Sequence, residues 1–276
     1  MNPHAQQSHS LIRLMRTLWT HRILIGNLTK RDIQGRYKGS AFGSIWSILN
    51  PLLMLTVFTF VFGEIFQSKW SGTKDGGGIT YAAALFTGLL LFNLFSECIG
   101  KAPTLIVSNP NYVKKVVFPI EILPVITTIS ALFHLATSYV VLIALIAFSE
   151  WGLHPGSIQA IIILIPLAIL ITGMSWLLAA LGAYLRDIGQ IIAPILTGTM
   201  FLSPIFYQLS NIDQKFHWLF RMNPISYPIE QMRNTILYNK PVDWAGYIGY
   251  FIIAVLSAKI GYYVFQKTRH GFADVL

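Results

Sequence analysis

Charge is what this sequence has least of. Only 11% of its 276 residues are Asp, Glu, Lys or Arg, whereas 54% are hydrophobic. A soluble domain normally carries about 25% charged residues, and a chain so poor in charge could not cover its own surface with polar groups. The composition therefore excludes an ordinary soluble domain and indicates an integral membrane protein.

Acidic residues are the scarcer of the two charged kinds. The chain has 11 Asp and Glu against 20 Lys and Arg, a formal net charge of +9. In a soluble protein this balance would suggest a nucleic-acid partner. Here the cations stand at the ends of apolar runs, where they set topology and contact anionic lipids, so we expect no nucleic acid. Only Glu64 and Glu97 come close to an intramembrane position, and both lie near the ends of their apolar runs, so no carboxylate relay for ion-coupled transport is predicted.

The usual motifs of catalysis and metal binding are missing. One cysteine, Cys98, allows no intramolecular disulfide and no paired-cysteine zinc site. The seven histidines are scattered, so we expect no metal site. We interpret His134 as a structural histidine whose ring is hydrogen-bonded in the core. No G-x-x-x-x-G-K-[ST] loop occurs, so the chain has no ATPase motif and no cofactor of its own. A multispan transferase would need clustered carboxylates or histidines, and an ion channel a filter or charged ring; neither pattern is found.

Six stretches are long and apolar enough to form transmembrane helices, each of which needs about 20 residues to cross about 30 Å of hydrocarbon. They are residues 41–66, 79–100, 120–148, 158–185, 188–207 and 244–265. The fifth has the weakest signal, because Pro194 lies within it and Pro204 near its end. The pattern predicts an all-α integral membrane protein with six transmembrane helices.

Lysine and arginine fall mostly on one side of these spans. Fourteen of the 20 lie on the side of the N-terminal tail, and six lie on the opposite side. By the positive-inside rule both termini are cytoplasmic, which agrees with an even number of spans. The expected divisions are a cytoplasmic N-terminal tail at 1–40, a transmembrane domain at 41–266 and a cytoplasmic C-terminal tail at 267–276.

Residues 11–20, LIRLMRTLWT, have the pattern of an amphipathic helix. On a helical projection the apolar side chains fall within one arc, and the two arginines and two threonines fall opposite. This pattern is typical of a helix in the membrane interface, with cations toward the headgroups and Trp19 at the boundary. The alternative is a soluble helix that packs on a partner; the span that follows so closely favours the interface.

The segment at 208–240 is too polar to span a membrane and too apolar for an ordinary loop. A stripe of apolar residues from Ile225 to Ile236 recurs with helical spacing. We expect two short re-entrant helices, about 213–222 and 226–238, that form a periplasmic gate between spans five and six. The alternative is an interfacial cap with no gating role.

Aromatic side chains make up 13% of the chain, and many lie within the spans. Their rings can stack on the apolar faces of sugars, so they indicate a path for a glycan. Phe58 and Phe62 share one helix face at a spacing of four residues. The alternative is that such side chains only face lipid or pack in the core.

Five blocks stand out along the chain. They are RDIQGRYKGSAFGSIWSILNPLL at 31–53, SNPNYVKKVVFPIEILP at 108–124, AYLRDIGQII at 183–192, FLSPIFY at 201–207 and MNPISYPIEQMRNTIL at 222–237. Together, with GFADVL at the C-terminus, they resemble the membrane subunits of bacterial type-2 ATP-binding-cassette exporters for polysaccharides, the O-antigen, capsule and teichoic-acid permeases. The resemblance covers nearly the whole chain in order.

The resemblance implies a coupling helix for an ATPase in the cytoplasmic loop at 108–119 and a second, smaller contact in the next cytoplasmic loop. The candidate ATPase contacts are Asn111, Tyr112, Lys114, Lys115, Arg186 and Asp187. For the two lysines the alternative is a topology signal alone. The resemblance also places Phe206 and Tyr207 at the periplasmic end of the fifth span.

We therefore expect a permease subunit of an exporter that moves lipid-linked polysaccharide from cytoplasm to periplasm across a bacterial inner membrane. Its partners would be an identical copy, two ATPase subunits that carry ATP and Mg²⁺, membrane lipids and the glycan. The candidate substrate residues are the cationic collar Arg31, Arg36 and Lys38, which would attract a pyrophosphate headgroup, and the aromatics Phe58, Phe62, Phe206 and Tyr207. The alternative for the collar is that its cations only set the topology. The alternative for the exporter is that it carries a drug or a small lipid.

Overall fold

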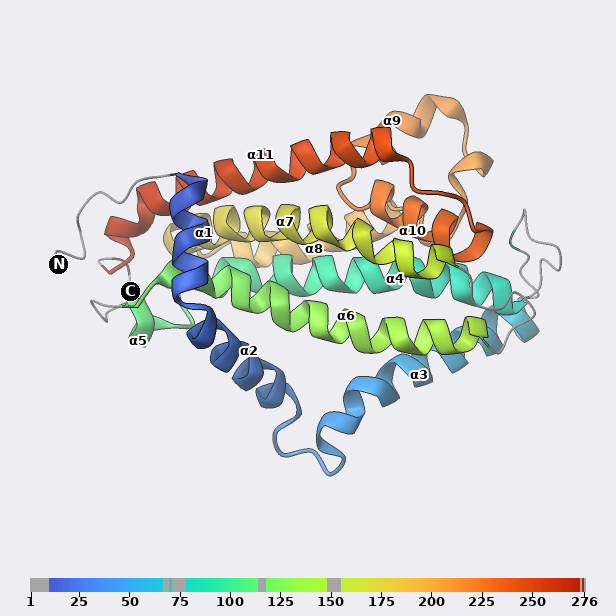
Figure 1. Ribbon diagram of the computed structural model, residues 1–276, viewed down its shortest axis with the longest axis horizontal. Coiled ribbons are helices and arrows are strands. Elements are labelled where there is room, and N and C mark those ends of the chain that lie inside the picture. The colour runs from blue at the N-terminus through green and yellow to red at the C-terminus, as the bar shows by residue number, and fades with distance from the viewer. Residues whose placement is uncertain are drawn as a thin grey trace.

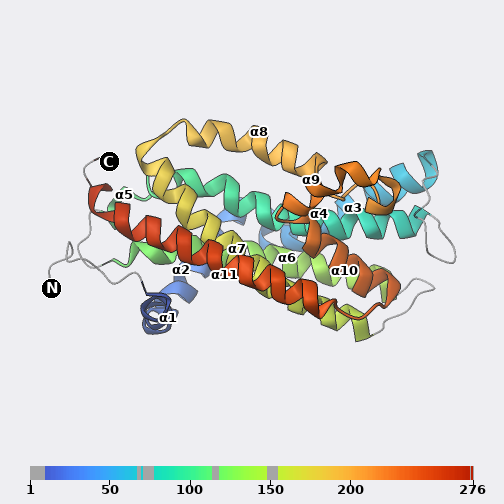
Figure 2. The ribbon, with the colours of Figure 1, turned by 90° about the horizontal axis from the view of Figure 1, so that it is seen from above.

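The long helices run lengthwise side by side in one bundle (Figures 1 and 2). The computed structural model describes residues 10–66, 70, 78–113, 118–147, 155–273 and 275, and every regular element within them is a helix. The bundle is built from α4 (Gly78–Lys101), α6 (Leu123–Ala147), α7 (Pro155–Tyr184) and α11 (Trp244–Thr268). The all-helical fold class predicted from composition is confirmed for this part of the chain.

Five helices are long and apolar enough to cross a membrane. Within the described residues they are Gly43–Ile65, Ile79–Thr104, Ile120–Ala147, Pro155–Tyr184 and Trp244–Gly271. They coincide with five of the six predicted spans. The last of them continues beyond residue 265, so the chain predicted as a C-terminal tail begins as helix.

The remaining predicted span, 188–207, differs from the expectation. There α8 (Ile188–Phe201) has only 14 residues, a length of about 21 Å, which is short of about 30 Å of hydrocarbon. The helix ends just before Pro204, which lacks a backbone N–H and restricts the residue before it. Six full-length helical spans are therefore not confirmed, although α8 runs alongside α4 (Figure 2).

The helix α1 (Leu11–Thr20) lies across one end of the bundle, roughly perpendicular to the long helices (Figures 1 and 2). Leu14 is buried, whereas Ile12, Met15 and Trp19 are each at least 70% exposed. The helix predicted at this place is confirmed. Its exposed apolar side chains are not covered by the described part of the chain.

The next two helices form a V that stands off the bundle (Figure 1). After α2 (Arg22–Tyr37) the chain reverses, and α3 (Trp46–Phe58) returns toward the bundle and continues as a π-helix over Thr59–Ile65. The reversal uses Gly39 and Gly43, whose φ angles are +88° and +52°. Glycine adopts such angles without a steric penalty, so these two residues suit the tip of the α2–α3 hairpin.

Two further helices, α9 (His217–Met222) and α10 (Ser226–Tyr238), lie at the end of the bundle away from α1 (Figure 1). They confirm, as helices, the two short segments predicted there. The predicted apolar stripe from Ile225 to Ile236 is fully buried, and α10 packs against α4 and α7.

Glycine lets α7 and α11 meet backbone to backbone. A Cβ atom on Gly173 would lie 2.5 Å from the backbone nitrogen of Ala258, and one on Gly261 would overlap the carbonyl oxygen of Gly173. Small residues at a crossing allow this close approach between transmembrane helices. The contact packs α11 closely along α7.

Candidate functional site

The predicted site residues fall into groups at opposite ends of the bundle. The inner end carries α1, α5 (Pro110–Val113), the connection between α7 and α8, and the last turn of α11; the outer end carries α9 and α10 (Figure 1). The two predicted collar residues on α2, Arg31 and Arg36, and those candidate ATPase contacts that the structure describes lie toward the inner end. Phe206 and Tyr207, which precede α9, lie toward the outer end.

At the inner end, the chain that leads into α5 is held against α7 and α8. A Cβ atom on Gly182, near the end of α7, would overlap the backbone of Pro103, and one on Gly189, in α8, would lie 3.8 Å from Cγ2 of Thr104. Pro103 and Thr104 thus pack against the end of α7 and the start of α8. The two ATPase contacts inferred from the resemblance lie in neighbouring segments.

The candidate contacts themselves differ in exposure. Asn111, Arg186 and Asp187 are exposed. Tyr112 is half-buried, and its ring stacks on Phe118 with centroids 4.3 Å apart and planes 14° from parallel. The candidates Lys114 and Lys115 lie outside the described residues.

Arg31 of the predicted collar contacts the predicted coupling loop directly. Its Nη2 atom donates a hydrogen bond to the hydroxyl of Tyr112 over 2.5 Å, and its guanidinium carbon lies 5.8 Å from the centre of that ring. The two groups are 81 residues apart in sequence. This hydrogen bond joins α5 to α2.

Arg36, on the last turn of α2, pairs with Glu97 of α4. Its Nη1 atom lies 2.8 Å from both carboxylate oxygens, and Nζ of Lys101 lies 2.9 Å from one of them. The Glu97 side chain is 14% exposed, whereas Arg36 and Lys101 are 50% and 49% exposed. Lys101 was not among the predicted site residues, although its spacing of four residues from Glu97 indicates such a pair.

Tyr37 extends the link between α2 and the bundle. Its hydroxyl lies 3.2 Å from Nδ1 of His134 in α6, and the rings meet edge to face at 5.8 Å. Burial raises the pKa of Tyr37 above its usual range, so the phenol stays neutral at physiological pH. The prediction of a hydrogen-bonded structural histidine at 134 agrees with this contact, although the ring is only half-buried.

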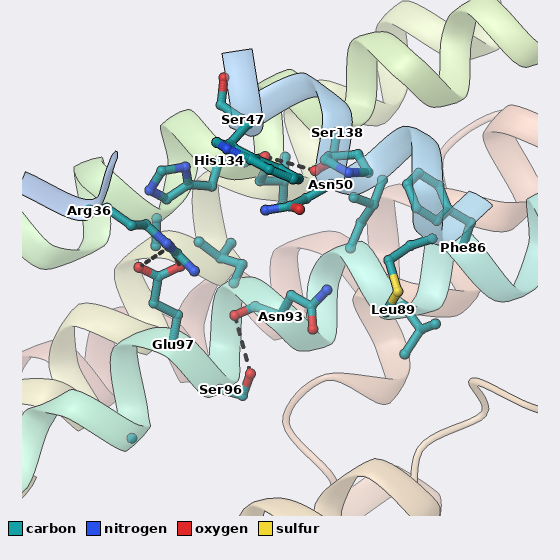
Figure 3. Close-up of a pocket in the computed structure, with 18 of the residues that line it drawn as sticks. Arg36, Ser47, Asn50, Phe86, Leu89, Asn93, Ser96, Glu97, His134 and Ser138 are labelled. Carbon is teal, nitrogen blue, oxygen red and sulfur yellow. Dashed lines mark hydrogen bonds and ion pairs between the residues drawn. The ribbon is translucent and has the colours of Figure 1, made fainter. Parts of the chain in front are cut away.

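These side chains border a cavity of about 620 Å³ between the α2–α3 hairpin and helices α4 and α6. Figure 3 shows the Arg36–Glu97 pair at one end of it and Phe86 and Leu89 at the other. Phe58, a predicted substrate residue, also lines the cavity. A second, smaller cavity lies beside Arg31. Lys38, the third collar residue, is exposed and borders neither of the two cavities.

The other predicted aromatics lie in a cluster toward the outer end. Phe62 lies 6.3 Å from Phe58, ring centre to ring centre, which confirms their shared face, and it stacks on Tyr81 at 5.1 Å. The Tyr81 hydroxyl donates to the carbonyl oxygen of Phe206 over 2.8 Å. Tyr207 donates its hydroxyl to the carbonyl of the last residue of α8. The hydroxyl groups of Tyr81 and Tyr207 thus hydrogen-bond to the backbone at the end of α8 and just after it.

Arg233 is a buried cation within this outer cluster, although its sequence position predicted only one of the six charges on the outer side. Its Nε donates to the carbonyl oxygen of Ala84 over 2.8 Å and its Nη2 to that of Ile205 over 2.6 Å; Nη1 reaches the carbonyl of Pro204. The guanidinium lies over the ring of Trp70 at 4.7 Å. Burial lowers the pKa of Arg233 to about 10, so it remains charged at neutral pH. It joins α10, α4 and the break after α8.

The sequence of this chain is also similar to those of known proteins. A family model described as "ABC-2 type transporter" matches residues 24–237, from within α2 to near the end of α10. An O-antigen export system permease protein RfbA from Myxococcus xanthus is 24% identical over 267 residues, 96% of this chain and 99% of the relative. A protein of the same name from Klebsiella pneumoniae is 26% identical over 253 residues, 90% of this chain and 93% of the relative, and a second Klebsiella pneumoniae RfbA is 24% identical over 257 residues, with the same coverage. With most of its length matched by the family model, this chain belongs to the ABC-2 type transporter family.

Proposed function

We propose that this chain is the permease subunit of an ATP-driven exporter that moves lipid-linked O-antigen, or a similar cell-surface polysaccharide, from cytoplasm to periplasm. The observation that carries the proposal is the end-to-end match to permeases named for O-antigen export, over 96% of this chain and 99% of the Myxococcus xanthus relative. All three relatives named above carry that name. They do not favour the alternative of a drug or small-lipid exporter.

The proposed topology has six crossings of the bacterial inner membrane and both termini in the cytoplasm. The α8 helix leads from the inner end toward the outer end (Figure 2), and together with the chain to Tyr207 it would form the remaining crossing. The inner end would be cytoplasmic because the flanking cations gather on that side. The perpendicular α1, with Ile12, Met15 and Trp19 exposed, would lie in the cytoplasmic interface.

The proposed partners are a second copy of this chain and two ATPase subunits, which would carry the ATP and Mg²⁺. The ATPases would dock on the inner end at α5 and at the exposed Arg186 and Asp187. The α3 and α8 helices expose apolar side chains such as Leu53 and Ile195, 50% and 52% exposed, which a second copy and lipid would cover. The α9 and α10 helices would gate the periplasmic exit.

In this scheme, ATPase closure on ATP displaces α5. The hydrogen bond from Arg31 to Tyr112 passes the displacement to α2, and the Arg36–Glu97 pair links α2 to α4. The α2–α3 hairpin then moves relative to the bundle, and the cavity that it borders changes shape. The permease contributes the path and the coupling contacts, while the energy comes from its partner.

Deletion of the gene in its host tests this function. Lipid-linked glycan is quantified on each face of the inner membrane, with the wild-type gene on a plasmid as the control. Export by this chain predicts that glycan accumulates at the cytoplasmic face and that surface polysaccharide is lost. Normal surface polysaccharide with no internal accumulation would show that the chain does not export it.

A further inference from the structure

The cavity between the α2–α3 hairpin and the bundle has two chemically different ends. Arg36, Glu97 and Lys101 border one end, and Phe86 and Leu89 border the other (Figure 3). A smaller cavity, also bordered by Arg36, Glu97 and Lys101, continues toward Arg31. A cationic mouth that leads into an apolar trough is complementary to an amphiphile with an anionic headgroup.

The cations at the mouth are not fully neutralised. Arg31, Arg36 and Lys101 face two carboxylates there, Asp32 and Glu97, which leaves one net positive charge. Within the described part of the chain, the hydrogen bonds of Arg36 all come from Nη1, so among these residues Nε and Nη2 are left to bind a ligand. Because Glu97 is largely buried while Arg36 and Lys101 are half exposed, the cations rather than the carboxylate face an incoming headgroup.

Polar groups line the cavity beyond the mouth. Asn50 on α3 and Asn93 on α4 point into the same space, and Ser47 and Ser138 lie on its walls (Figure 3). Trp46 adds an aromatic ring. Hydrocarbon chains need no amides or hydroxyls, whereas sugar hydroxyls hydrogen-bond to amides, and sugar rings pack on aromatic faces.

We propose that this cavity binds the carrier end of the lipid-linked glycan, the phosphate-bearing junction between lipid and first sugar. The phosphate contacts Arg36 and Lys101, the first sugar lies against Asn50 and Asn93, and the lipid chain leaves along the apolar wall. The proposal rests on the proposed export function. It shifts the headgroup site from the collar of Arg31, Arg36 and Lys38 to Arg36 and Lys101, with Glu97 as an internal competitor for both.

Substitution of Glu97 tests the proposal, because a phosphate site and a purely structural ion pair predict changes in lipid affinity of opposite direction. If the cluster only holds α2 to α4, Arg36→Gln and Glu97→Gln break the same ion pair and have the same effect. If Arg36 and Lys101 bind phosphate, Glu97→Gln removes a competing anion and strengthens binding, whereas Arg36→Gln and Lys101→Gln weaken it. Lys30→Gln is the matched control, because Lys30 is an exposed cation of α2 that borders neither of these two cavities.

The experiment uses the full chain with its ATPase in nanodiscs of phosphatidylethanolamine and phosphatidylglycerol. Undecaprenyl phosphate is titrated in, and bound lipid is counted by native mass spectrometry. We expect Arg36→Gln and Lys101→Gln each to weaken binding about tenfold, equivalent to ~1.4 kcal/mol, Glu97→Gln to strengthen it about threefold, and Lys30→Gln to leave it unchanged. Bound ATPase and the melting temperature are measured for each variant, so that misfolding is recognised.

Three results would overturn the proposal. One is wild-type affinity in Arg36→Gln and Lys101→Gln; another is a parallel loss in Arg36→Gln and Glu97→Gln, which marks a purely structural pair. The third is occupancy by phosphatidylglycerol that undecaprenyl phosphate does not displace, which makes the occupant a bilayer lipid. None of these results affects the gene-deletion test, so failure of the carrier site can be told apart from failure of the export function.

Discussion

The Nε atom of Arg233 donates a hydrogen bond to the carbonyl oxygen of Ala84 over 2.8 Å, from α10 into the middle of the outer half of α4. The same guanidinium reaches the carbonyls of Pro204 and Ile205, where the chain leaves α8. One fully buried cation therefore satisfies three carbonyls from two separate segments. A charge in such a place is stable only when it is hydrogen-bonded in this way.

Arg233→Met should destabilise the outer end. The substitution removes three charge-assisted hydrogen bonds and leaves buried carbonyls without a donor, which costs about 3 kcal/mol or more. We expect a clear fall in the melting temperature of the detergent-solubilised protein. Arg221→Met, which removes an exposed arginine from the neighbouring α9, is the control and should melt like the wild type. An unchanged melting temperature for Arg233→Met would show that α10 does not depend on this contact.

Gly261→Ala should separate α7 from α11. The new Cβ atom would overlap the carbonyl oxygen of Gly173, and overpacking of this kind costs about 1–3 kcal/mol. Gly249→Ala is the matched control, because it adds the same methyl group to the same helix where nothing lies within 4 Å. Thermal unfolding of both variants in detergent measures the difference. Equal stability of the two would contradict the close α7–α11 contact.

Arg186→Glu should weaken the hold of the permease on its ATPase. Arg186 is exposed on the α7–α8 connection, where we place the second ATPase contact. Reversal of its charge should reduce the amount of ATPase that co-purifies in mild detergent by several-fold, without a change in membrane insertion. Lys240→Glu makes the same reversal at the outer end and should co-purify as well as the wild type. If both variants lose the ATPase equally, the contact is not at the inner end.

Cysteine labelling should place the inner and outer ends on opposite sides of the membrane. Cys98 is 1% exposed, so the native cysteine should stay unlabelled. Lys240→Cys should react with a membrane-impermeant maleimide in spheroplasts, whereas Arg186→Cys should react only after the membrane is permeabilised. This pattern requires the short α8 segment to complete a crossing. Labelling of both positions from the same side would leave only five crossings.

Much of the fold follows from local pattern. The predicted span at 79–100 corresponds to α4 (Gly78–Lys101), because a long apolar run has no other low-energy state in hydrocarbon than a helix. By contrast, α2 (Arg22–Tyr37) was not predicted. Its apolar residues gather in the first half rather than along one stripe, and Gly26 and Gly35 lower its helix propensity; contacts with α6 and α4 hold it instead.

Less of the site could be read from the sequence. The pairing of Glu97 with Lys101 follows from their spacing, but the pairing with Arg36 depends on how α2 folds back over the bundle. The role of Arg233 was hidden for a similar reason, since its polar neighbours indicated a surface segment. Contacts between residues far apart in the chain are set by tertiary packing, which local periodicity does not encode.

The most direct test of the central claim is transport in a purified system. The chain and its ATPase are reconstituted in proteoliposomes with a lipid-linked O-antigen, and ATP is supplied only to the face that carries the ATPase. The account predicts that glycan moves to the opposite leaflet, where a membrane-impermeant glycan-cleaving enzyme or lectin detects it, and that it does so only with hydrolysable ATP. Glycan that remains on the ATPase side despite ATP hydrolysis would contradict the account.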